Sequence, residues 1–285
     1  MNSDYSQPLM LPFPTRKAGI AEKLAYAESQ RTLLDQALWD SYKEEGSLPR
    51  FVSQTAESIL SNARECFDHL GRDLIECHLV PVAKPSFRIA YIGGKIRQYF
   101  PFYPGQLSNP QAAFHQFKTA NRSIYDELRF LVDAMDNNLS LLNTSHAVRK
   151  FRIIQEMVNE KKHSRVLAYD SVANERMFVQ GSSGSCLFDK DFRNDHPNIQ
   201  ILLPRGFSSK RVAAYRFSCN GMDVSDLCLF ASHATAMLMD LFYDKFFSAT
   251  APVFQPEPPP TITVSDSPPV DEFETDRIKN IIDLP

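Results

Sequence analysis

The chain has 285 residues, of which 43% are hydrophobic and 23% charged, and its formal net charge is −3. This composition is typical of a globular protein and excludes collagen-like, coiled-coil-only and wholly disordered chains. The slight negative charge argues against a general nucleic-acid coat, but it leaves room for a local basic face that binds RNA.

No run of about 18 apolar residues occurs, and the N-terminus holds acid and proline where a signal peptide needs a basic and then an apolar segment. We therefore expect a cytoplasmic protein with no membrane partner. The five cysteines form no C-x-x-C pair. This pattern predicts reduced thiols, with no metal and no cofactor.

The first half of the chain reads as helical. Residues 17 to 45 carry apolar side chains near a 3.6-residue period, which predicts a long amphipathic helix. A Gly-Ser-Leu-Pro step ends it, and a second helix is predicted at 52 to 79, antiparallel to the first because the link is short. A segment rich in proline and aromatic residues follows at 82 to 108, where we expect an irregular excursion with one short strand at 87 to 92.

Three further helices are predicted, at about 110 to 117, 123 to 135 and 145 to 165. Beyond residue 165 the apolar period changes from 3.6 to 2, which indicates a small antiparallel sheet. A last amphipathic helix follows an Asn-Gly turn at 220 and 221. The predicted strands are 166 to 169, 176 to 180, 185 to 189, 199 to 203 and 212 to 219.

The C-terminal 36 residues differ from the rest because they hold 8 of the 19 prolines. Seven acidic and two basic side chains give this tail a charge of −5, so the remaining body is +2. Such a composition predicts a disordered tail. The alternative is that its last residues, 271 to 285, dock on a protein partner or back on the body of the chain.

We therefore predict a mainly α protein of the α+β kind: an antiparallel helical bundle with a small antiparallel β-sheet insertion and a disordered C-terminal tail. The expected parts are a flexible N-terminal segment at 1–16, the helical bundle at 17–165 with its irregular excursion at 82–108, a β region at 166–221, a closing helix at 222–249 that packs on the bundle, and the acidic tail at 250–285.

Two polar clusters could carry chemistry. In the second predicted helix, Asn62 and His69 share one face, whereas Arg64 and Asp68 form an i, i+4 pair on the adjacent face. So many polar groups on a core-forming helix need partners or a cleft, because an unpaired buried one costs about 1–3 kcal/mol.

The second cluster lies near the end of the helix predicted at 145 to 165. Asn159, Lys162 and His163 stand at i, i+3 and i+4, so they project from one side. Cations near a helix C-terminus are also common stabilising features.

Together the two clusters resemble the N-L-R-x-x-L-D-H-L and N-x-x-K-H-R signatures of a group of uncharacterised bacterial helical proteins, in the same order and over roughly residues 17 to 248. Here Ala63 stands for the usual Leu and Ser164 for the usual Arg. That group is similar to HEPN domains, helical bundles of toxin and phage-defence systems. Many of these are metal-independent RNases with an R-x4–6-H motif, which the spacing of Arg64 and His69 satisfies.

The resemblance implies a cytoplasmic, HEPN-like endoribonuclease that binds RNA and works as a homodimer, since one chain supplies a single His69. An imidazole can move protons near neutral pH, and a guanidinium can hold a phosphate. The implied catalytic residues are His69 and Arg64, and the implied binding or orienting residues are Asn62, Asp68, Asn159, Lys162 and His163.

Helix geometry argues against this catalytic pair. Residues five apart on an ideal helix point about 140° apart, so Arg64 and His69 do not naturally contact one phosphate. The alternative function is a non-catalytic protein-interaction module in which the same polar residues form a structural network. Asp68 would accept from Arg64 or Arg72, and His69 would pack against the second cluster.

Three other patterns are predicted to be structural. The Gly-Gly-Lys sequence at 93 to 95 lacks the frame of a phosphate loop and indicates a turn. The Gly- and Ser-rich segment at 181 to 185 indicates a hairpin loop. The aromatic run at 99 to 103 could stack on bases, but covering of the core is the stronger prediction.

Overall fold

The computed structural model describes residues 16–44, 51–137, 148–163, 167–181, 184–189 and 206–247. It is mainly helical with a small antiparallel sheet, as the sequence predicts. The chain divides into two units, one of residues 1–170 and 215–255 and the other of residues 171–214 and 256–285.

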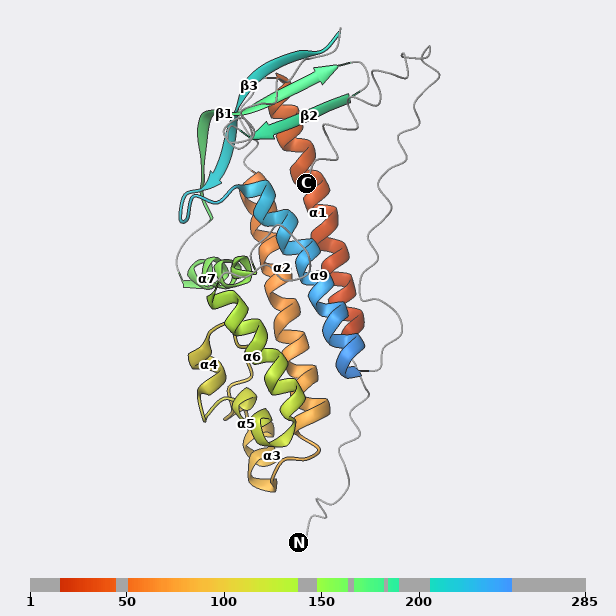
Figure 1. Cartoon of the computed structure of the whole chain (residues 1–285), viewed down its shortest axis with the longest axis vertical. Coiled ribbons are helices and arrows are strands. Elements are labelled where there is room, and N and C mark those ends of the chain that lie inside the picture. The colour runs from red at the N-terminus through yellow and green to blue at the C-terminus, as the bar shows by residue number, and fades with distance from the viewer. Residues whose placement is uncertain are drawn as a thin grey trace. The chain divides into compact units, whose positions relative to one another are not determined.

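Three long helices lie side by side in the first unit (Figure 1). α1 (Lys17–Glu44) packs on α2 (Phe51–Leu74), and α9 (Val224–Phe247) packs on both. The side of α1 that faces them is apolar at every third or fourth residue, so Ile20, Leu24 and Ala27 are buried. The helices predicted at 17 to 45 and from 222 onward are confirmed.

The second predicted helix, at 52 to 79, is also present. Its last turn is η1 (Ile75–Leu79), a π-helical turn in which Val80 N donates to Ile75 O over 2.9 Å. Such turns are rare within α-helices and occur often at functional sites.

The strand predicted at 87 to 92 is wrong, because these residues belong to a helix, α3 (Pro85–Ile92). Proline suits the first turn of a helix, and Lys84 before it is extended, so the chain enters a helix here. Phe87 and Tyr91, one turn apart, stack with 6.3 Å between ring centroids. A short apolar run cannot by itself distinguish a strand from a helix.

The excursion at 82 to 108 contains a second unpredicted helix, α4 (Pro104–Ser108), which follows the capping residue Tyr103. The predicted helices downstream are confirmed as α5 (Ala113–Ala120), α6 (Arg122–Asp136) and α7 (Arg149–His163). Within this unit α7 packs on α2, α6 and α9. The start predicted for α7 at residue 145 lies outside the described residues.

The centre of the bundle is aromatic. The ring of Phe67 on α2 lies 5.0 Å from that of Phe100 and 5.1 Å from those of Phe102 and Phe151, measured between centroids. All four side chains are buried. The prediction that the aromatic run at 99 to 103 covers the core is therefore confirmed for its two phenylalanines.

The second unit contains most of a three-stranded sheet with strand order β2-β1-β3. The strand predicted at 176 to 180 belongs to the longer β1 (Tyr169–Gly181), which pairs antiparallel with β2 (Gly184–Asp189). Of the strand predicted at 166 to 169, only Tyr169 belongs to β1, and Leu167 and Ala168 are not in a strand. The hairpin predicted at 181 to 185 is confirmed by the pairing of Gly181 with Gly184. β3 (Ser208–Phe217) corresponds to the strand predicted at 212 to 219.

Gly181 cannot be replaced without rearrangement, since a Cβ there would lie 2.4 Å from the Phe207 ring. The N-terminal residues 1–15, the strand predicted at 199 to 203 and the acidic tail at 250–285 lie outside the described residues. None of the helices in the described part of the chain is both long and apolar enough to cross a membrane.

A charged cluster joins α1 to α9. Arg31 donates to Glu28 over 2.6 and 2.9 Å and contacts Asp35, while His233 Nε2 lies 3.4 Å from Glu28. Burial raises the pKa of Glu28, but the hydrogen bonds of His233 and Arg31 outweigh it and lower this pKa to about 2.

We expect acid to weaken the bundle partly through this carboxylate. The unfolded chain binds a proton near the ordinary pKa of 4.5, while the folded chain resists protonation until about 2. The stabilisation, on the order of 1–3 kcal/mol, is therefore present above pH 4.5 and lost as the pH falls toward 2. Glu28→Gln should remove it at pH 7 and approach wild-type stability at pH 2.

Urea unfolding from pH 7 to pH 2 measures this effect. The control is Glu22→Gln, which changes an exposed acid of the same helix. If both variants follow the wild-type pH dependence, Glu28 does not contribute to acid sensitivity.

Candidate functional site

Arg64 is enclosed by its neighbours inside the bundle. Its side chain is only 6% exposed, and its Nη1 lies 2.7 Å from Asp68 Oδ1, one turn along α2. Its guanidinium also lies over the Phe102 ring, 5.2 Å from the centroid, and its buried Nε and Nη1 form no hydrogen bond with any described residue, so the contact with Asp68 is an ion pair. The i, i+4 pairing predicted for a structural network is confirmed here.

His69 lies in a different environment, on the side of α2 that faces α1. It is half-buried, and its Nδ1 has no hydrogen-bond partner in the part of the chain that the structure describes. Burial lowers its pKa, and the positive charges of Lys23, Arg16 and Arg72 lower it further. The imidazole is therefore neutral at physiological pH.

The two implied catalytic residues have different neighbours. Arg64 contacts Asp68 and the aromatic core, whereas the charges that act on His69 come from Lys23, Arg16 and Arg72.

The other motif residues that the structure describes, Asn62 and Asn159, lie apart from this pair. Asn62 donates to the Ser58 carbonyl over 2.8 Å, a bond within its own helix. Asn159 is exposed on α7. Lys162 and His163 belong to the last turn of α7, and their side chains lie outside the described part of the structure.

The best-connected polar cluster lies elsewhere, at the end of α2 and the start of η1. Asp73, 1% exposed, accepts from Tyr243 Oη over 2.5 Å and from Arg16 Nη1 over 2.8 Å. Arg16 also pairs with Glu76, which accepts from Tyr91 Oη over 2.9 Å. The cluster joins residues beside or within α1, α2, η1, α3 and α9.

Electrostatics favour a structural role for this cluster. Burial and the bond to Asp73 raise the pKa of Tyr243, so the phenol remains protonated and donates. Burial and the nearby carboxylates raise the pKa of Cys77 to about 12, which makes its thiol unreactive at neutral pH. No three His, Cys, Asp or Glu residues among those described are placed to hold a metal ion.

Sequence reasoning missed this cluster, although one signal was present. Asp73 and Glu76 stand at i, i+3 in the last turns of a core-forming helix, where a buried carboxylate requires partners. The sequence could not identify those partners, because Arg16, Tyr91 and Tyr243 lie far away along the chain.

The fold and these contacts define a mainly α-helical protein whose long helices are joined by internal polar clusters. Comparisons with protein-family models, with curated proteins and with solved structures found no match.

Proposed function

We propose that the protein is a HEPN-like, non-catalytic interaction module in which the polar residues of α2 hold the bundle together. The observation that carries this proposal is the enclosure of Arg64 between Asp68 and Phe102. A guanidinium that is 6% exposed cannot approach a phosphate without disrupting the core around it. The HEPN resemblance itself rests on the two sequence motifs.

A second function, metal-independent RNA cleavage of the toxin or phage-defence type, is favoured by His69. A neutral imidazole can accept the proton of a ribose 2′-hydroxyl while that oxygen attacks phosphorus, and nearby cations can stabilise the added negative charge. Here Lys23 and Arg72 would take the place that the motif assigns to Arg64. The imidazolium formed by that transfer would then give its proton to the departing 5′-oxygen, and a homodimer would bring two such histidines to one groove.

RNA cleavage in the presence of EDTA separates the two functions. The interaction module predicts that the wild-type protein releases no more product than His69→Ala. The control is His233→Ala, which removes a histidine from α9, and the thermal stability of both variants should be measured.

The same proposal predicts that Arg64→Met lowers the free energy of unfolding by about 1–3 kcal/mol, because it removes the ion pair and the contact with the Phe102 ring.

In the cleavage assay, EDTA-resistant cleavage that is lost in His69→Ala and kept in His233→Ala would overturn the proposal in favour of the nuclease.

A further inference from the structure

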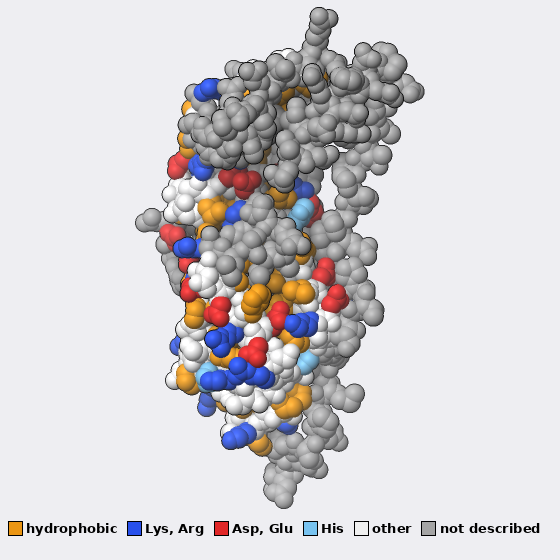
Figure 2. Space-filling view, viewed as in Figure 1, with side chains coloured by type: hydrophobic (Ala, Val, Ile, Leu, Met, Phe, Trp, Pro, Cys, Tyr) orange, Lys and Arg blue, Asp and Glu red, His pale blue; other side chains and the backbone are white. Residues whose placement is uncertain are grey.

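One end of the helical unit is formed by a stretch of chain that contains basic side chains and no acidic ones. Residues 77 to 125 contain no Asp or Glu and six Lys or Arg. This acid-free segment includes α3, α4 and α5, which lie at the end of the bundle where α2 ends (Figure 1). On the face shown in Figure 2, basic, histidine and apolar side chains cover that end, and acidic ones lie only farther along the bundle.

Two of these six cations have partners among the described residues. Arg88 donates to backbone carbonyls and Arg122 pairs with Asp126, which satisfies both. The other four are exposed and form no ion pair with any described residue, which leaves them available to an anionic ligand: Lys84, Lys95, Arg97 and Lys118.

α3 adds apolar surface to the same end. None of its side chains is buried, and Ile89 and Ile92 are 64% and 68% exposed. Exposed apolar side chains beside unpaired cations are typical of surfaces that bind nucleic acid, since these must contact both bases and phosphates.

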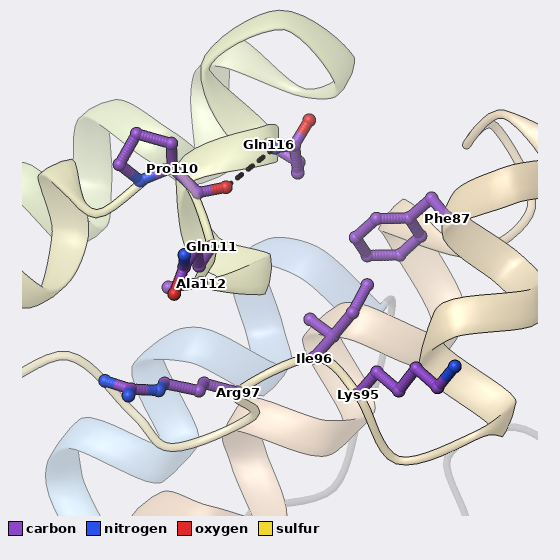
Figure 3. Close-up of a pocket in the computed structure, with 8 residues that line it drawn as sticks. All are labelled: Phe87, Lys95, Ile96, Arg97, Pro110, Gln111, Ala112 and Gln116. Carbon is purple, nitrogen blue, oxygen red and sulfur yellow. Dashed lines mark hydrogen bonds between the residues drawn. The ribbon is translucent and has the colours of Figure 1, made fainter.

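A pocket of about 400 Å³ opens on this surface (Figure 3). Ile96 points into it between Phe87 and Gln111, while Lys95 and Arg97 extend toward opposite sides. Gln116 forms part of the wall and donates to the Pro110 carbonyl over 3.3 Å.

The backbone beneath the pocket is held in place. Lys95 N donates to Ala90 O over 2.9 Å, and Arg97 O accepts from Ala113 N over 3.2 Å. Gly94 makes the turn that precedes Lys95, and its φ of +68° is a backbone conformation that favours glycine. The two cations therefore stand on a defined loop between α3 and α4.

We infer that this pocket binds single-stranded nucleic acid, with one base against Phe87 and Ile96 and the phosphates on either side of it at Lys95 and Arg97. Because Lys95 and Arg97 extend in opposite directions, they are better placed to contact two successive phosphates of a strand than to contact a single phosphate group together. The Phe87 and Ile96 side chains suit the flat face of an unstacked base, and the Gln111 amide can both donate to and accept from its edge. The site uses neither Arg64 nor His69, so it does not depend on the proposed function.

Fluorescence anisotropy with a labelled single-stranded RNA of about ten nucleotides tests the inference. We expect Lys95→Gln/Arg97→Gln to weaken binding at least tenfold and to reduce the slope of log K against log salt by about 1.4, the value for two lost phosphate contacts. The control is Lys43→Gln/Arg149→Gln, which removes two exposed charges outside the acid-free segment and should bind like the wild type.

Two further variants separate charge from shape. Lys95→Arg/Arg97→Lys keeps both charges and should retain binding. Phe87→Ala removes the stacking surface and should weaken binding by about 5- to 100-fold at an unchanged salt slope. His69→Ala should bind like the wild type, which keeps this test distinct from the cleavage assay.

Several outcomes would overturn the inference: no binding by the wild type, equal loss in the control, or equal affinity for duplex RNA, which offers no unstacked base. Competition by a mononucleotide as effective as that by the oligonucleotide would overturn the two-phosphate geometry. Binding of an acidic peptide in place of RNA would assign the surface to a protein partner.

Discussion

Asp73→Ala is expected to lower the free energy of unfolding by about 2–4 kcal/mol, because it leaves one buried and one partly buried partner without their acceptor. The carboxylate accepts from Tyr243, which is fully buried, and from Arg16, which is partly exposed. The Tyr243 hydroxyl would then lie in the core unsatisfied. The partial exposure of Arg16 lets water replace its lost bond, so the effect is smaller than for a fully buried pair.

Urea unfolding followed by circular dichroism measures the loss. Tyr243→Phe keeps the ring and removes only the donor, so it should cost about 1–2 kcal/mol. The two changes should be less than additive when combined, because they break the same bond. Asp133→Ala, which changes an exposed acid of α6, should cost less than about 0.5 kcal/mol.

Additive effects of Asp73→Ala and Tyr243→Phe would contradict the proposed coupling. A loss no larger than that of Asp133→Ala would show that the cluster does not hold α2 and α9 together.

Phe67→Ala is expected to destabilise the protein by about 3–5 kcal/mol, because it empties the centre of the aromatic core. Its ring touches those of Phe100, Phe102 and Phe151, which come from two other parts of the chain. The remaining rings are rigid and cannot fill the space that the missing side chain leaves.

Phe130→Ala is the matched control, since this phenylalanine of α6 is 55% exposed. It should cost less than about 1 kcal/mol, and the slope of unfolding free energy against urea should be the same in both variants. Similar losses at the two positions would mean that Phe67 is not the centre of the core.

The Phe67 ring also bears on the Arg64–Asp68 pair of α2. Phe102 contacts both Phe67 and the Arg64 guanidinium, so the polar cluster of α2 rests directly on the aromatic core. If Phe67→Ala also changes the environment of Arg64, the structural role of this arginine gains support.

The sequence by itself determined the long helices and the hairpin. α1, α6 and α9 follow from apolar residues at a period of 3.6, and Asn121 caps α6 by accepting from Ile124 N over 3.3 Å. These signals are local, because each lies within a few residues of the element that it specifies.

Only the tertiary structure decided what each polar side chain meets. α3 is a helix although its short apolar run also fits a strand, and the partners of Asp73 lie 57 and 170 residues away along the chain. Burial and charge pairing depend on which distant segments come together, and helical periodicity carries no information about the segment that will lie opposite. For this reason the sequence placed the polar groups on their helices, while the packing of α1, α7 and α9 around α2 assigned their partners.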